Sequence, residues 1–264
     1  MEQKQGSAHS VSCVVCADAA CADRARTLSA RIGVPCVSEQ PTDDALCLVV
    51  DAQGCALAAG ALMCRCDFAD EVRRLRPSSL SRELVVRAAR TKHAAGGEPP
   101  LVVDATAGFG QDSLLLAAAG FSVILFERDP VICALLSDAL ERGARDPRLV
   151  DAVARMELRC EDSIQALPAL TRAPDVVLLD PMFPARTKSA QVKKKFQLIH
   201  RLEGPACDEE ALLRAALAAR PRKVVVKRPV KGPHLAGAKP GYAIAGKAVR
   251  YDVIVPPRAG GVAD

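Results

Sequence analysis

The chain has 264 residues with a net charge of +5; half of them are hydrophobic, only 3% are aromatic, and none is tryptophan. This length fits one large α/β domain, with or without a smaller one, and Ala, Val and Leu must fill most of its core. No apolar run approaches the roughly 20 residues that a transmembrane helix needs, and the first residues lack the basic and apolar segments of a secretory signal, so we expect a cytoplasmic protein.

Residues 1–95 have the pattern of a small α+β unit. Short apolar runs predict strands at 11–15 and 46–50, and a helix is expected over 17–31 between them. A second helix is expected over 81–92, where apolar residues recur on one face. We therefore expect residues 1–95 to form a domain of their own.

Cysteines are concentrated in this first part of the chain, where eight of the eleven lie. Cys13 and Cys16 have the spacing of a zinc-binding pair, but no second Cys or His pair follows to complete four ligands. Other cysteines, such as Cys47 between Leu46 and Leu48, have apolar neighbours, where cysteine packs as a small hydrophobic residue. We expect packing thiols and no metal site.

Residues 96–264 alternate between strand and helix patterns. Strands are predicted at 101–103, 122–126, 156–159, 175–179 and 224–226. Helices are predicted at 111–119, 130–142 and 208–220. A last pair of strands, 242–245 and 249–255, is expected to form an antiparallel hairpin. This order predicts an α/β fold with a doubly wound, mainly parallel sheet.

A glycine-containing turn follows the first of these strands. Asp104 ends the strand, and Gly108 and Gly110 allow the backbone to approach a ligand at the start of the next helix. Glu127 ends the second strand, where a carboxylate can accept hydrogen bonds from ribose hydroxyls. These features fit NAD and S-adenosylmethionine alike, although Ser113 replaces the third glycine of the dinucleotide pattern.

Three further polar residues have two interpretations each. Asp162 and Ser163 follow the third strand, where they would either contact an adenine or cap the next helix. Asp112 would either cap its own helix or face the amino-acid end of a cofactor. The sequence leaves both alternatives open.

Asp180-Pro181-Met182-Phe183-Pro184 follows an apolar strand and is the most informative motif. A nucleobase can stack on Phe183 while its exocyclic amine donates hydrogen bonds to the Asp180 carboxylate and the Pro181 carbonyl. This arrangement predicts alkylation of a base amine, whereas the structural alternative is a proline-rich turn. We predict Asp180, Pro181 and Phe183 as catalytic residues.

Two long basic stretches follow this motif. Residues 181–202 hold six Lys or Arg and residues 211–251 hold ten, and neither stretch contains an acid. Such a distribution favours a polyanionic partner over a solvated basic face. The predicted phosphate contacts are Lys188, Lys193, Lys194, Lys195, Lys227 and Arg228.

The motifs together resemble one family. The segments DATAGFGQD, FERDP, LDPMFP, KSAQVKK and VVVKRP, between residues 101 and 255, closely resemble the ribosomal RNA small subunit methyltransferase J family. This resemblance implies a Rossmann-like methyltransferase that uses S-adenosylmethionine to methylate the N2 amine of a guanine in 16S ribosomal RNA. It also implies cofactor contacts at Gln111 (commonly Arg in the family), Asp112, Glu127, Arg128, Asp162, Ser163 and Asp180.

The sequence is also compatible with other functions. The same acid-Pro-x-aromatic geometry would serve an amino-methyltransferase that acts on DNA or on a protein amide. A nucleic-acid-binding protein without activity is the alternative from another class, and a nicotinamide dehydrogenase ranks last. The expected partner is 16S ribosomal RNA or the small ribosomal subunit, with no membrane and no metal, because a sulfonium donor needs no Lewis acid.

Overall fold

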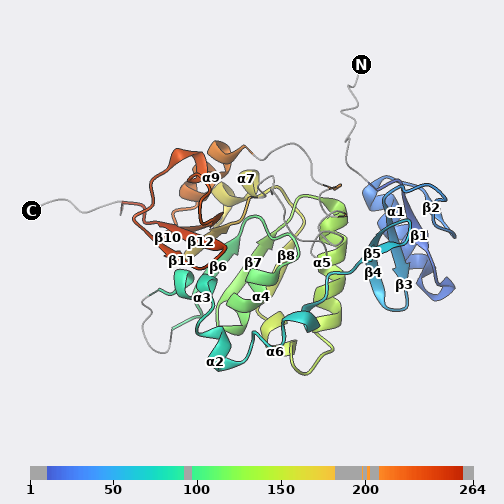
Figure 1. Ribbon diagram of the computed structural model, residues 1–264, viewed down its shortest axis with the longest axis horizontal. Helices are drawn as coiled ribbons and strands as arrows, with labels where there is room; N and C mark the ends of the chain where they lie inside the picture. Colours follow the sequence, from blue (N-terminus) through green and yellow to red (C-terminus); the bar gives the residue numbers. More distant parts are fainter. Residues whose placement is uncertain (1–10, 92–96, 182–197, 199–200, 203–207, 258–264) are drawn as a thin grey trace, which may run out of the picture. The chain divides into compact units, whose positions relative to one another are not determined.

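The computed structural model describes residues 11–91, 97–181, 198, 201–202 and 208–257 (Figure 1). Contacts group these residues into two units. Unit 1 holds 11–67, 129–142 and the described residues of 198–202, and unit 2 holds 68–91, 97–128, 143–181 and 208–257. This grouping differs from a cut after residue 95. The division into two independently folding domains, 1–95 and 96–264, stays a prediction.

Unit 1 contains a five-stranded sheet in the order β2-β1-β3-β4-β5. The strands are β1 (Cys13–Cys16), β2 (Cys36–Val37), β3 (Cys47–Asp51), β4 (Gly54–Ala59) and β5 (Leu62–Cys64). β1 runs parallel to β2 and β3, and the last three strands are antiparallel. The helices are α1 (Ala22–Ile32), which replaces the longer helix predicted over 17–31, and α5 (Pro130–Gly143).

Buried cysteines pack in this sheet as the sequence predicts. Cys13 and Cys47 are 4% and 1% exposed and belong to one apolar cluster with Val15, Val49 and Ala56. Within the described residues, no group of three or more His, Cys, Asp or Glu side chains has an arrangement that could hold a metal ion.

Unit 2 contains a seven-stranded sheet in the order β11-β12-β10-β9-β6-β7-β8 (Figure 1). The strands are β6 (Leu101–Asp104), β7 (Ser122–Phe126), β8 (Met156–Arg159), β9 (Val176–Leu179), β10 (Lys223–Pro229), β11 (Tyr242–Ala245) and β12 (Val249–Ile254). β6 to β10 are parallel, and β12 is antiparallel to both β10 and β11. The predicted parallel sheet and its terminal hairpin are confirmed.

Helices cover both faces of this sheet. The α-helices of unit 2 are α2 (Pro77–Leu80), α3 (Leu84–Ala89), α4 (Gln111–Ala118), α6 (Val150–Val153), α7 (Ser163–Ala166) and α9 (Glu209–Ala218). Short 3-10 turns lie at η2 (Phe68–Glu71), η3 (Leu167–Ala169) and η4 (Leu235–Gly237), and another, η1 (Ala19–Cys21), precedes α1 in unit 1. α4 contacts α3 and α6, whereas α9 contacts α7, η3 and η4. Because α3 also contacts β11 and β12, residues before 95 join unit 2.

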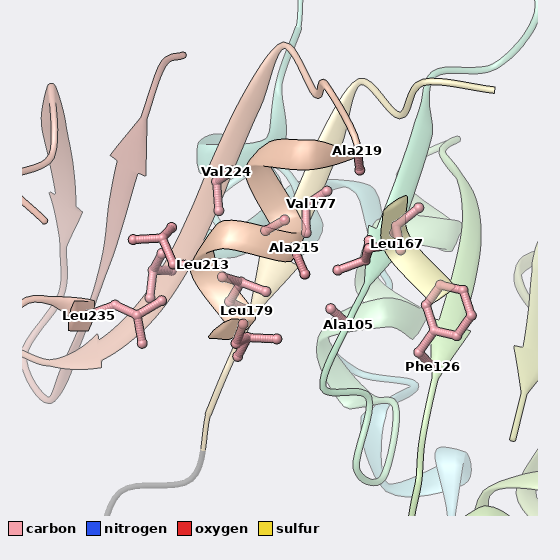
Figure 2. Packing of buried hydrophobic residues seen from close by; sticks show 14 of the residues in the cluster. Ala105, Phe126, Leu167, Val177, Leu179, Leu213, Ala215, Ala219, Val224 and Leu235 are labelled. Carbon is pink, nitrogen blue, oxygen red and sulfur yellow. The ribbon is translucent and has the colours of Figure 1, made fainter. Parts of the chain in front are cut away.

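The core between the sheet and α9 is mainly aliphatic, with Phe126 as its aromatic member. Figure 2 shows Val177 and Leu179 of β9 and Val224 of β10 facing Leu213 and Ala215 of α9. Burying one such Val or Leu side chain contributes about 1.5–3 kcal/mol. Because aromatic residues are scarce in this sequence, small and branched aliphatic side chains provide most of the packing that holds the strands against α9.

Within the part of the chain that the structure describes, every helix is too short or too polar to span a bilayer.

Candidate functional site

Polar side chains gather where the parallel strands of unit 2 end. Asp104 is the last residue of β6, Glu127 follows β7, and Asp180 follows β9. β6 lies between β7 and β9, so the order of strands reverses there. Ligands of open α/β sheets bind in the crevice at such a reversal, outside the carboxyl ends of the strands.

The glycine turn after β6 forms one wall of this region. Gly108 and Gly110 have φ angles of +54° and +68°, which L side chains rarely adopt. The Gly108 N–H donates to Glu127 Oε2 at 3.0 Å. A Cβ atom placed on Gly108 would meet no atom within 4 Å, so the turn faces open space beside the carboxylate.

Asp104 supports the turn from beneath. Its side chain is buried; Oδ2 accepts from Ser113 Oγ at 2.6 Å, and Oδ1 accepts from the Thr106 N–H at 3.1 Å. Burial raises the pKa of Asp104 to about 7, although the hydrogen bond from Ser113 opposes the shift. Ser113, which breaks the dinucleotide pattern, therefore has a structural partner. Direct contact of Asp104 with a cofactor stays a prediction.

This pKa makes the stability of the protein depend on pH. A carboxyl whose pKa is higher in the folded state holds its proton there while the unfolded chain has lost it, so stability falls as pH rises from about 4 to about 7. The Asp104→Asn variant keeps the shape and lacks this titration. Relative to wild type, it should gain on the order of 2–4 kcal/mol across that window.

Thermal unfolding of both proteins at several pH values measures the difference. Asp151→Asn, at an exposed position, is the matched control and should follow the wild-type curve. A constant difference in unfolding temperature between Asp104→Asn and wild type from pH 4 to 7 would contradict the assignment.

A lysine lies between two carboxylates at the same sheet edge. Lys227 Nζ is 2.8 Å from Asp180 Oδ2 and 3.0 Å from Asp112 Oδ2. We call Asp112, Asp180 and Lys227 the Asp-Lys-Asp cluster. The Tyr251 hydroxyl donates to Asp112 Oδ2 at 2.9 Å. The Asp180 side chain is the most open of the cluster, 42% exposed against 13% for Asp112 and 27% for Lys227.

The charges in the cluster shift each other's protonation. Burial alone would lower the pKa of Lys227, but the two carboxylates raise it above its usual value, so the ammonium is retained. Burial raises the pKa of Asp180, and Lys227 counteracts this shift. Burial and the neighbouring Asp112 raise the pKa of Tyr251, which keeps its hydroxyl as a donor. Lys227 therefore favours the ionised form of Asp180.

The two predicted phosphate contacts on β10 have other partners in the structure. Lys227 is held by the two carboxylates, and the Arg228 side chain is 0% exposed. Arg228 donates to Glu209 Oε1 at 3.0 Å and to the Pro233 carbonyl at 2.9 Å. Successive residues of a strand point to opposite faces of the sheet, so these two neighbours cannot share one surface. Arg228 thus has a structural role.

The remaining predicted cofactor residues lie at the starts of α4 and α7 and directly after β7. The Asp162 carboxylate caps α7 by accepting from the Ile164 N–H at 2.9 Å, so the capping interpretation is observed, and the buried Ser163 begins that helix. Gln111 Nε2 donates to Glu71 Oε1 at 2.9 Å. Arg128 is exposed directly after Glu127. Their contacts with a cofactor stay predictions.

Part of the predicted site lies outside the described residues. Pro181 is buried directly after Asp180. The other predicted residues of this segment lie outside the described residues: Phe183, Lys188, Lys193, Lys194 and Lys195.

Comparison with known proteins decides the family. The family described as "Putative SAM-dependent methyltransferase" matches residues 38–256. A ribosomal RNA small subunit methyltransferase J from Thioalkalivibrio sulfidiphilus is 43% identical over 241 residues, which cover 88% of this chain and 93% of the relative. The one from Pseudomonas aeruginosa strain LESB58 is 42% identical, covering 89% and 91%. The chain belongs to the ribosomal RNA small subunit methyltransferase J family.

A solved structure supports the same assignment. The SAM-dependent methyltransferase from Neisseria gonorrhoeae has a TM-score of 0.73 to this chain at 33% identity, covering 94% of this chain and 97% of the other. The resemblance predicted from the motifs is thus confirmed, together with the Rossmann-like fold. As a member of this methyltransferase family, the protein uses S-adenosylmethionine as its cofactor.

The site of this methyltransferase fits that cofactor. The open space beside Gly108 and the adjacent Glu127 carboxylate match a ligand that carries ribose hydroxyls. The sequence did not predict Tyr251, Thr106 or Glu71 as parts of the site. Thr106 Oγ1 accepts from the Asp180 N–H at 2.6 Å and so joins the glycine turn to the segment that follows β9. Thr106 lies in the DATAG segment that was identified as a family motif, and this was the sequence signal that could have pointed to it.

Proposed function

We propose that this enzyme transfers a methyl group from S-adenosylmethionine to the exocyclic N2 amine of a guanine in 16S ribosomal RNA. The proposed substrate is supported by the relatives, which are ribosomal RNA small subunit methyltransferases. The observation that carries the chemistry is the Asp-Lys-Asp cluster at the carboxyl end of β9. Acting on ribosomal RNA fits a cytoplasmic protein.

The proposed mechanism rests on how Asp180 presents its carboxylate. The N2 lone pair of guanine is delocalised into the ring, so the amine is a poor nucleophile. Lys227 binds Asp180 Oδ2, and within the described residues Oδ1 makes no hydrogen bond. Oδ1 accepts a hydrogen bond from the amine, and the Pro181 carbonyl accepts the second. Both contacts orient the lone pair for attack and favour pyramidal nitrogen.

Asp180 also compensates the charge that develops during methyl transfer. As the N–C bond forms, positive charge develops on the amine, and the ionised Asp180 stabilises it. The amine then loses one proton by way of Asp180 Oδ1. The cofactor, when bound, would supply the electrophilic methyl group of its sulfonium, with the methyl C–S bond breaking as the N–C bond forms and a neutral thioether as the leaving group. No covalent enzyme intermediate is needed.

The other predicted residues have binding roles in this proposal. Glu127 and the Gly108 turn hold the ribose of the cofactor, and Asp162 and Ser163 lie near the adenine. Gln111, Asp112 and Arg128 border its remaining part. Phe183 stacks on the target base, a contact worth about 1–3 kcal/mol. Phosphates of the RNA bind Lys188, Lys193, Lys194 and Lys195.

Methyl transfer with a labelled cofactor tests the proposal. The purified protein should label small-subunit ribosomal RNA and leave DNA and bulk protein unlabelled. Mass spectrometry of RNA from cells with and without the gene should then find one N2-methylguanine that depends on it. Label on DNA or on a protein amide would support the alternative acceptors, and no label on any of them would favour an inactive RNA-binding protein.

A further inference from the structure

A surface hollow of about 400 Å³ lies in unit 2 around α2 and the start of α3, apart from the Asp-Lys-Asp cluster. Three of its six lining residues are arginines. The lining consists of Arg73, Arg74, Ser79, Arg82, Glu83 and Leu84.

Arg74 is fixed in the wall by two carboxylates. Its Nε and Nη2 donate to the two oxygens of Glu83 at 2.9 and 2.8 Å, and its Nη1 donates to Glu71 Oε2 at 2.7 Å. The hydrogen bonds from Arg74 to Glu83 raise the pKa of Arg74 despite its partial burial. The acids near the hollow are thus already paired with this one guanidinium.

The other two arginines have no such partner. Arg73 and Arg82 are exposed, and neither makes an ion pair or side-chain hydrogen bond with any residue that the structure describes. Arg76, also exposed, lies between them in the chain. Because the carboxylates of Glu71 and Glu83 are both held by Arg74, the hollow presents net positive charge to solvent.

A hydrogen-bond chain joins this wall to the methyl-transfer site. Glu71 binds Arg74 through Oε2 and accepts from Gln111 Nε2 through Oε1 at 2.9 Å. Gln111 precedes Asp112, which belongs to the Asp-Lys-Asp cluster. The wall of the hollow is therefore linked by hydrogen bonds to the first turn of α4, which also carries Asp112.

We propose that this arginine hollow binds the phosphodiester backbone of the RNA substrate through Arg73 and Arg82. The inference rests on the proposed function and adds a contact surface to it. Planar guanidinium groups match phosphate oxygens in pairs, and a volume near 400 Å³ falls within the range of about 300–1,000 Å³ typical of ligand sites. Arg74 stays with its glutamates and shapes the wall.

The double variant Arg73→Gln/Arg82→Gln tests the proposal. Its affinity for labelled small-subunit ribosomal RNA should fall about tenfold near 0.1 M salt. The slope of log affinity against log salt should decrease by about 1.4–1.8, as expected for the loss of two phosphate contacts. The KM for RNA should rise while kcat and the calorimetric affinity for S-adenosylmethionine stay unchanged, which shows that the variant is folded.

The control variant Arg145→Gln/Arg155→Gln removes the same charge from exposed arginines elsewhere in unit 2. It should keep the wild-type salt slope. Equal slopes for the two double variants, in a preparation whose wild type methylates this RNA, would overturn the arginine hollow and leave the proposed function standing. A wild-type protein that transfers no methyl group to this RNA would overturn the proposed function and the inference with it.

Discussion

The Asp180→Asn variant should lose about 10²–10³-fold in kcat and retain its fold. The substitution keeps the size of the side chain but removes the negative charge that stabilises the developing cation, and one preorganised electrostatic contact is worth about that factor. Single-turnover methyl transfer to small-subunit ribosomal RNA measures the effect. Thermal unfolding of the same samples shows whether the fold is retained.

Two comparisons make this result specific. Asp151→Asn removes one exposed carboxylate of unit 2 and should retain full activity. Loss of activity in Asp180→Asn with an unchanged affinity for RNA assigns the defect to the chemical step. Wild-type kcat in this variant would disprove the proposed mechanism.

The Lys227→Met variant should lose about 10–100-fold in kcat at neutral pH, and its acidic limb of activity should move to higher pH. Lys227 opposes the effect of burial, which raises the pKa of Asp180. Without the ammonium, the pKa of Asp180 increases further, and Asp112 adds repulsion. A larger share of Asp180 is then protonated at a given pH and cannot accept a hydrogen bond from the amine. The pH profile of kcat measures this shift.

Lys227→Arg separates charge from structure in this experiment. It restores the positive charge, so its acidic limb should return toward the wild-type position even if kcat stays reduced. If both variants have lower activity and a lower unfolding temperature, and the acidic limb of the pH profile does not move, Lys227 has only a structural role. The proposal that Lys227 keeps Asp180 ionised is then wrong.

Much of unit 2 could be predicted from local patterns. The strands predicted at 122–126 and 156–159 coincide with β7 and β8, and Pro130 begins α5 as expected. Apolar periodicity and helix-starting residues act within a few positions of the chain, so they can be recognised without the fold. Glycines with positive φ at 108 and 110 are likewise where the sequence predicts a turn.

Prediction was less complete where neighbours in space decide the outcome. The helix predicted over 81–92 is shorter, Leu84–Ala89, with a separate turn of helix at Pro77–Leu80. β12 is inserted between β10 and β11, so the hairpin pairs with the parallel sheet through its second strand. That position places Tyr251 next to Asp112, 139 residues earlier in the chain.

The sequence by itself determined the family, the order of strands and helices along the chain, and the acidic residues at the strand ends. Those properties reside in local patterns and in motifs that related chains share. Only the tertiary structure decided that Lys227 pairs with Asp112 and Asp180 and that Arg228, one residue later, is buried against Glu209. Strand pairing and the alternation of side chains across a sheet set which charges meet, and both depend on segments distant in the chain.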